Sequence, residues 1–97
     1  MSIIVTRTSY PNGSQKSEEY TFNGKRHNLA GYAFKSWFPN GKVERIEYRK
    51  RGQLHNSSGR YALKILYPNG KSKRLEYHQD GKPYNPNGYA IKKWRSN

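Results

Sequence analysis

The chain has 97 residues without a cysteine, and 32% of them are hydrophobic. A chain of this length forms one domain with a modest core, and the lack of cysteine excludes disulfides and thiolate metal sites. Nineteen Lys and Arg residues outnumber six acidic residues and give a net charge of +13, which attracts polyanions such as nucleic acid, an acidic protein surface or an anionic membrane. The apolar run at 3–5 is too short for a membrane span or a signal peptide, so we expect a soluble, cytoplasmic protein.

The expected order of elements begins with a strand at 2–9, followed by a turn with the sequence Tyr-Pro-Asn-Gly at 10–13. The same aromatic-Pro-Asn-Gly turn returns at 38–41 and 67–70, so the copies start 28 and 29 residues apart. A fixed period of this size is typical of repeat proteins, in which no unit buries its apolar face alone. We therefore predict one repeat domain over residues 1–97, with the N-terminal strand and repeats at about 10–37, 38–66 and 67–94.

Each unit has the pattern of a hairpin followed by a return loop. Pro, Asn and Gly in this order fit a type I turn with a glycine bulge. A Glu-Tyr pair then precedes a second turn glycine, and a Tyr-Ala-apolar-Lys segment ends the unit. Apolar residues do not recur at helical spacing, and Gly and Pro leave no window of helix length. The predicted fold is all-β: an antiparallel meander of repeated β-hairpins, in a single-layer or curled sheet of about seven strands.

The turn type decides which side chains share a face. Counting outward from a bulged turn at 38–41 sets Phe34 opposite Ile46, whereas a tight two-residue Asn-Gly turn sets Phe34 opposite Glu47. We favour the bulged turn because it pairs apolar with apolar side chains. The face assigned to the core then carries the aromatic and apolar residues of each unit, for example Tyr32, Phe34, Phe38, Ile46 and Tyr48.

The opposite face is expected to hold the candidate binding site. It presents a basic row with two tryptophans and two further arginines beside it: Arg7, Lys35, Lys64, Lys92, Trp37, Trp94, Arg45 and Arg74. At about 4.8 Å per strand and two strands per unit, successive lysines lie roughly 10 Å apart. Cations spaced along an extended surface bind phosphates, and aromatic side chains stack on the bases of single strands. The repeated Glu19, Glu47 and Glu76 are expected to form structural ion pairs, with the lysine row as one possible partner.

Alternatives stay open for the residues of this row. The lysines could serve only to keep an open sheet soluble, although the excess of basic residues elsewhere favours an anionic partner. Trp37 and Trp94 could pack beneath the return loops. His27 and His55 occupy equivalent positions, where the third unit has Tyr84, and this favours a role in turns or packing over metal binding.

The motifs YPNGK, the Glu-Tyr pair, NGK and the Gly-Tyr-Ala strand opening resemble a MORN-variant repeat, and the resemblance extends from Ser9 to Trp94. It implies an elongated single-layer sheet that binds proteins or lipid headgroups, and some proteins of this kind are classed as antitoxins. It implies no catalytic residues. The period is longer here than in the standard pattern, and the usual cluster of glycines after the aromatic residue is thinned out.

The leading hypothesis is a non-enzymatic binding module whose basic face engages nucleic acid or a nucleoprotein complex, with no cofactor and no metal. A nucleophilic triad, a P-loop and a dinucleotide fingerprint are all missing from the sequence. The alternative is a protein-binding inhibitor, such as an antitoxin, immunity or anti-defence factor, that docks on an acidic protein surface. Membrane binding is disfavoured because an amphipathic helix or apolar anchor is lacking. The terminal strands at 3–9 and 89–95 are unpaired edges in a monomer and offer a route to a homodimer.

Overall fold

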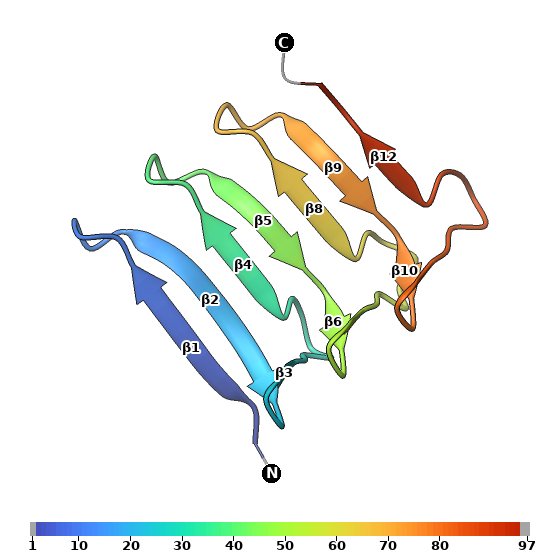
Figure 1. The fold of residues 1–97 in the computed structure, drawn as a ribbon, viewed down its shortest axis with the longest axis horizontal. Helices are drawn as coiled ribbons and strands as arrows, with labels where there is room; N and C mark the ends of the chain where they lie inside the picture. Colours follow the sequence, from blue (N-terminus) through green and yellow to red (C-terminus); the bar gives the residue numbers. More distant parts are fainter. Residues whose placement is uncertain (1, 96–97) are drawn as a thin grey trace.

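The computed structural model describes residues 2–95 and contains one large antiparallel sheet with two small ones (Figure 1). The large sheet follows chain order through β1 (Ile4–Ser9), β2 (Gln15–Phe22), β4 (Phe34–Trp37), β5 (Val43–Glu47), β8 (Leu63–Leu66), β9 (Ser72–Glu76) and β12 (Ile91–Lys93). The short strands are β3 (Lys25–Arg26), which pairs with β2, and the pairs β6 (Arg49–Lys50) with β7 (Gln53–Leu54) and β10 (His78–Gln79) with β11 (Lys82–Pro83). The predicted all-β meander of repeated hairpins is confirmed.

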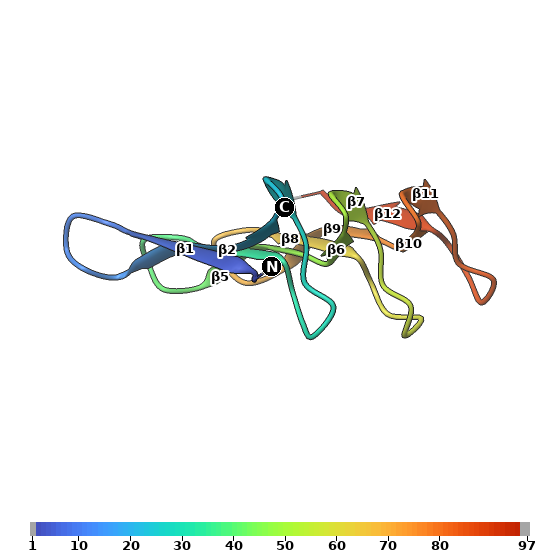
Figure 2. The same ribbon diagram turned by 90° about the horizontal axis from the view of Figure 1, so that it is seen from below.

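The sheet is a single layer. The Cα positions extend over 45 × 43 × 16 Å, and a thickness of 16 Å that includes the loops leaves no room for a second sheet about 10 Å away. Seen edge-on, the short hairpins that contain β7 and β11 project to one side, whereas the return loops project to the other (Figure 2). The strands β1 and β12 end the sheet on either side, where the sequence places the two edges.

The Pro-Asn-Gly segments form the expected turn. In the second unit, the N–H of Gly41 donates to the carbonyl of Phe38 at 2.9 Å, and the N–H of Phe38 donates to the carbonyl of Lys42 at 2.8 Å. Gly41 has a φ of 88°, which is the conformation that a glycine bulge after a type I turn requires. The side chain of Asn40 adds a further hydrogen bond from the N–H of Lys42 at 2.9 Å.

A second bulge in the same hairpin overturns the predicted register. Trp37 pairs with Val43, but Ser36 pairs with Arg45, so Glu44 has no partner position on β4. Equivalent register shifts occur in the first and third hairpins. Every pairing beyond the bulge is displaced by one residue. Phe34 therefore lies opposite Glu47, and the predicted pairing of Phe34 with Ile46 is wrong although the predicted turn is right.

This displacement removes the expected core side. Phe34 shares a face with Glu47, whereas Ile46 shares the other face with Lys35, so the apolar residues expected together are divided between the two faces. Within residues 2–95, the buried hydrophobic side chains are few: Ala33, Ala62 and Leu63. The largest side chain that is fully buried in this part of the chain is Glu47, so the centre of the sheet is charged.

Histidines join successive units. His27 Nδ1 accepts a hydrogen bond from the N–H of Arg51, and His55 Nδ1 accepts one from the N–H of Asp80, both at 2.9 Å. Arg51 and Asp80 have φ values of 53° and 49°, a left-handed conformation that non-glycine residues disfavour. Each histidine thus holds the strained turn of the following unit, in agreement with the turn role expected for it.

Candidate functional site

One side of the sheet, which we call the glutamate face, alternates carboxylates with apolar side chains. Cross-strand pairing aligns six residues in one row: Glu19, Phe34, Glu47, Leu63, Glu76 and Ile91. Directly opposed residues on neighbouring strands are in side-chain contact. Glu47 and Glu76 are therefore flanked on both sides by apolar side chains that limit their access to water, whereas Glu19 lies between Phe34 and Thr6.

Glu47 is fully buried and binds three arginines. Its Oε1 accepts hydrogen bonds from Arg26 at 3.0 Å and from Arg49 at 2.5 Å, and its Oε2 accepts one from Arg45. Burial alone raises the pKa of Glu47, but hydrogen bonds and charges from Arg49 and Arg45 outweigh it and hold the pKa below its ordinary value. The carboxylate is therefore charged, and its acceptor capacity is used within the protein.

Arg26 connects two units of the glutamate face. Its Nε–H donates to Glu19 at 2.5 Å while its Nη1 donates to Glu47 at 3.0 Å. The guanidinium also lies over the ring of Phe34, 3.9 Å from the ring centroid. A planar cation stacked on a ring and bound to two carboxylates is the arrangement that arginine provides better than lysine.

Arg45 and Arg74 belong to this face, and the prediction that they lie beside the lysine row is wrong. Arg74 donates to Glu76, whose other oxygen lies 2.6 Å from His78 Nε2. Burial raises the pKa of Glu76, but His78 and Arg74 outweigh it and lower the pKa. The second bulge explains the misplacement, since it moves each arginine, together with the glutamate two residues further along its strand, to the face opposite the lysine row. The expected ion pairs thus exist, but with arginines and not with the lysine row.

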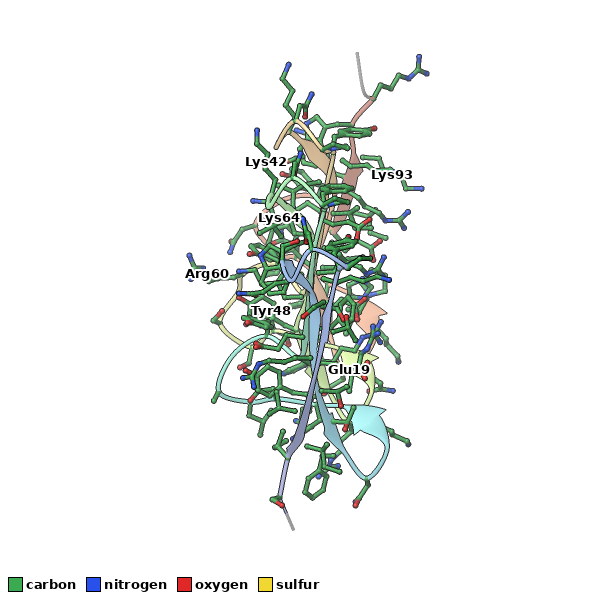
Figure 3. The ribbon with its side chains drawn as sticks, turned by 90° about the vertical axis from the view of Figure 1, so that its left-hand side faces the viewer. Glu19, Lys42, Tyr48, Arg60, Lys64 and Lys93 are labelled. Carbon is green, nitrogen blue, oxygen red and sulfur yellow. The ribbon has the colours of Figure 1, made fainter. Side chains whose placement is uncertain are left out.

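The opposite side of the sheet, which we call the lysine face, carries the predicted basic row. Cross-strand pairing aligns seven residues: Arg7, Glu18, Lys35, Ile46, Lys64, Leu75 and Lys92. Figure 3 shows Lys64 and Tyr48 on one side of the sheet and Glu19 and Lys93 on the other. Two strand spacings, about 10 Å, separate successive cations, so the four predicted basic residues form one row across the sheet.

Aromatic rings hold the three lysines of this row in place. The distances from Nζ to the ring centroid are 5.4 Å for Lys35 to both Tyr32 and Trp37, 5.6 Å for Lys64 to Tyr61, and 5.1 Å for Lys92 to both Tyr89 and Trp94. A ring face attracts an ammonium group without neutralising it. The contacts therefore restrict the position of each charge and leave the charge available to a ligand.

Trp37 and Trp94 lie at the Pro-Asn-Gly end of their strands. Both are half-buried, and their carbonyl groups accept hydrogen bonds from the phenols of Tyr10 at 2.7 Å and Tyr67 at 2.8 Å. The return loops lie at the other end of the sheet (Figure 1). The alternative that these tryptophans pack beneath the loops is therefore wrong, and both remain beside the lysine row.

Arg7 differs from the lysines because it has an acidic partner. Its Nε–H donates to Glu18 at 2.7 Å, and Glu18 also accepts hydrogen bonds from the phenols of Tyr32 at 2.5 Å and Tyr20 at 3.0 Å. The bonds from Tyr32 and Arg7 lower the pKa of Glu18, whereas burial and the bond to Glu18 raise the pKa of Tyr32. The first position of the row is thus partly neutralised.

The two faces differ in charge balance. The arginines of the glutamate face are bound to carboxylates, whereas within residues 2–95 no carboxylate lies within 4.0 Å of the ammonium groups of Lys35, Lys64 or Lys92. Sequence reasoning found the lysines but not the tyrosines that hold them. The signal was present, because a tyrosine precedes each of these lysines by three residues.

The part of the chain that the structure describes has no group of three or more His, Asp or Glu side chains that could hold a metal ion. The repeated glutamates are engaged by arginines or a histidine. Over the same residues, no helix is long and apolar enough to cross a membrane.

Comparisons with known protein families, with curated proteins and with solved structures found no match for this chain. The resemblance to MORN-variant repeats therefore stays a prediction.

Proposed function

We propose that this protein is a non-enzymatic module that binds nucleic acid through its lysine face, mainly by contacts to phosphates. The observation that carries the proposal is the row of Lys35, Lys64 and Lys92, each held on an aromatic ring and none neutralised by a described carboxylate. Fixed and uncompensated charges favour a ligand that supplies anions at regular intervals. A polynucleotide backbone is such a ligand.

The contrast between the two faces supports this proposal over a role in solubility alone. A sheet that needs only solubility could mix charges of both signs, and acidic residues serve solubility better than lysines. Here the repeated Glu19, Glu47 and Glu76 are on the glutamate face, Glu18 on the lysine face is bound to Arg7, and the other three basic residues of the row lack an acidic partner among residues 2–95. The uneven distribution produces a surface on which positive charge predominates, and such a surface speeds association with a polyanion.

The proposal is tested by fluorescence anisotropy with labelled single-stranded RNA, single-stranded DNA and duplex DNA at several salt concentrations. Four phosphate contacts to a single strand predict a slope of about −2.8 in a plot of log K against log salt, and three predict about −2.1. Affinity then falls roughly 20- to 50-fold between about 50 and 200 mM salt. A salt-independent interaction would contradict phosphate contacts.

The decisive variant replaces Lys35, Lys64 and Lys92 with glutamine. A matched control replaces three exposed lysines away from the row, Lys25, Lys82 and Lys93, and changes the net charge by the same amount. We expect the row variant to lose most of the affinity and to have a slope shallower than about −1. The salt slope of the control should differ from that of the unmodified protein by less than the value of one phosphate contact, about 0.7. Equal losses in the two variants would show that only net charge matters and would refute a defined site.

Failure of every nucleic-acid probe to bind at low salt would favour the alternative function, a protein-binding inhibitor. In that case the lysine face would dock on an acidic protein surface, as an antitoxin, immunity or anti-defence factor does. The discriminating measurement is a pulldown treated with nuclease. A stoichiometric protein partner that survives the treatment and is lost with the row variant would support the inhibitor reading.

A further inference from the structure

Three clefts lie along the lysine face, beside the return loops. The first has a volume of about 450 Å³ and lies between the edge strand residues Ile3 and Val5 and the loop at 28–32. The second, of about 230 Å³, separates the loops at 28–31 and 55–60. The third, of about 280 Å³, separates the loops at 56–59 and 84–87. Each cleft is lined by the tyrosine of one Glu-Tyr pair, in order Tyr20, Tyr48 and Tyr77.

The cleft walls are held in one conformation by a repeated asparagine. Asn28 donates its amide to the carbonyl of Tyr32 at 3.0 Å, and its Oδ1 accepts a hydrogen bond from the N–H of Ala30 at 3.0 Å. Asn56 and Asn85 make the equivalent pair of hydrogen bonds in the second and third loops. An asparagine that closes its own loop in this way preorganises the backbone, so the clefts do not need to form when a ligand arrives.

A continuous set of contacts connects each cleft to the lysine row. In the middle unit, Lys64 lies over the ring of Tyr61, which packs edge-to-face on Tyr48 with 5.7 Å between centroids. The first and third units repeat the arrangement, with tyrosine pairs at 5.8 and 6.1 Å. Ile46 lies opposite Lys64, and Tyr48 is two residues further along the same strand. Tyr48 therefore lies about 7 Å from the lysine row along the strand. Arg60 lines the middle cleft on the same face (Figure 3).

We infer that these clefts receive unpaired bases, and hence that the ligand of the lysine face is a single-stranded nucleic acid. The inference rests on the proposed function and names its substrate class. The backbone would follow the lysine row, and each sugar would span the short distance from a phosphate on a lysine to a base beside a cleft tyrosine. Aromatic side chains stack on any base, so this binding has little sequence preference.

The spacing of the clefts excludes a stacked duplex from this arrangement. Neighbouring clefts are two strands apart, about 10 Å, whereas stacked bases follow one another at about 3.4 Å. Bases that enter neighbouring clefts must therefore be unstacked from each other. An extended single strand meets this condition, whereas a duplex meets only the lysines and leaves the clefts empty.

The test compares a labelled single-stranded DNA with an oligonucleotide of the same length whose nucleotides all lack bases, and with the corresponding duplex. All three probes carry phosphates for the lysine row, but only the first has unpaired bases. We expect the single strand to bind at least tenfold more tightly than the abasic probe, which corresponds to stacking of about one base. Equal affinities for the abasic probe and the single strand, or tighter binding of the duplex, would overturn the inference while the proposed function stands. Lack of binding to all three probes would refute the proposed function itself.

Variants that fill the clefts separate base binding from phosphate binding. Ala30→Leu with Ser57→Leu changes two exposed loop positions that line the clefts and leaves the tyrosines and the lysine row in place. The control is Gln15→Leu, an exposed position near the Pro-Asn-Gly end of the sheet. The cleft variant should bind the single strand about as weakly as the unmodified protein binds the abasic probe. The affinity of the variant for the abasic probe should be unchanged. A second variant, Tyr48→Leu, should lose affinity only for base-bearing probes, and Tyr48→Phe should restore it because the ring is retained. Unchanged single-strand affinity in the cleft variant would overturn the inference.

Discussion

Replacement of Glu47 with glutamine should destabilise the protein more than any other neutral substitution of a carboxylate. Glutamine keeps the size of the side chain but removes the charge that three arginines share. Removing one partner of a buried ion pair costs about 3–5 kcal/mol, because the remaining charge stays uncompensated. Arg45 keeps 38% of its side-chain area exposed, so water can solvate it in part. We therefore expect the lower value, about 3 kcal/mol.

This loss is large compared with the whole stability of the domain. A chain of 97 residues has a free energy of unfolding of about 5–15 kcal/mol. With a urea m-value of about 1.5 kcal/mol/M, the expected loss lowers the unfolding midpoint by about 2 M. Urea denaturation followed by tryptophan fluorescence or circular dichroism measures this shift directly.

The control for this experiment is Glu44→Gln. Glu44 is half-buried, and its carboxylate accepts a hydrogen bond from Ser36 at 3.2 Å, which glutamine can still accept. Its midpoint should change by less than about 0.5 M. Adding Arg49→Met to Glu47→Gln should recover part of the lost stability, since it removes one unpaired charge. Equal midpoints for Glu47→Gln and the control would refute the view that this ion-pair cluster stabilises the fold.

Two further predictions concern stability. The pKa values of Glu47 and Glu76 lie below the ordinary value of 4.5, so their contribution is complete above about pH 4.5 and is lost as the pH falls through the folded pKa. The urea midpoint should therefore drop as the pH falls below about 4.5, and less so in Glu47→Gln; an equal drop in both proteins would contradict this assignment. Ala62→Leu should cost about 1–3 kcal/mol, because Ala62 is fully buried and its backbone bonds Tyr48 and Glu76 at 2.7 Å. The same change at the equivalent but less buried Ala90 should cost less, and urea midpoints that rank the two in the reverse order would contradict this explanation.

The basic row could be predicted because it depends on spacing along the chain. Lys35, Lys64 and Lys92 recur at one repeat position, and equivalent positions of neighbouring hairpins must lie on the same face whatever the register within each hairpin. Trp37 and Trp94 follow their lysines by two residues and therefore share that face. These assignments agree with the structure for that reason.

Arg45 and Arg74 could not be placed in the same way, since they lie on the other strand of their hairpins. Their face depends on the number of residues between the turn and the cross-strand pair. The residue Glu44 that forms the second bulge has no turn-forming chemistry, and its place in the first and third units is taken by Lys16 and Lys73. Such a bulge leaves no strong local pattern in a single sequence.

The clefts are a further feature that only the folded chain reveals. Their tyrosines and asparagines are visible as repeats, but the second and third clefts are formed by residues of neighbouring units, and the first by the N-terminal strand and the first unit. Asn28 and Ser58 line the same cleft although they are distant in the sequence. A pattern within one unit carries no information about the gap between two loops.

The sequence by itself determined the repeat, the positions of the turns and the order of the strands, because these depend on local chemistry. Proline restricts φ, glycine permits positive φ, and a constant period requires neighbouring units to stack. Only the tertiary structure decided which side chains share a face and where the charges are neutralised. The physical reason is the period of two in a β-strand: one bulged residue in each hairpin moves every later side chain to the opposite face. Arg45 and Arg74 therefore leave the face of the lysine row together with Glu47 and Glu76, and within residues 2–95 no carboxylate lies within 4.0 Å of Lys35, Lys64 or Lys92.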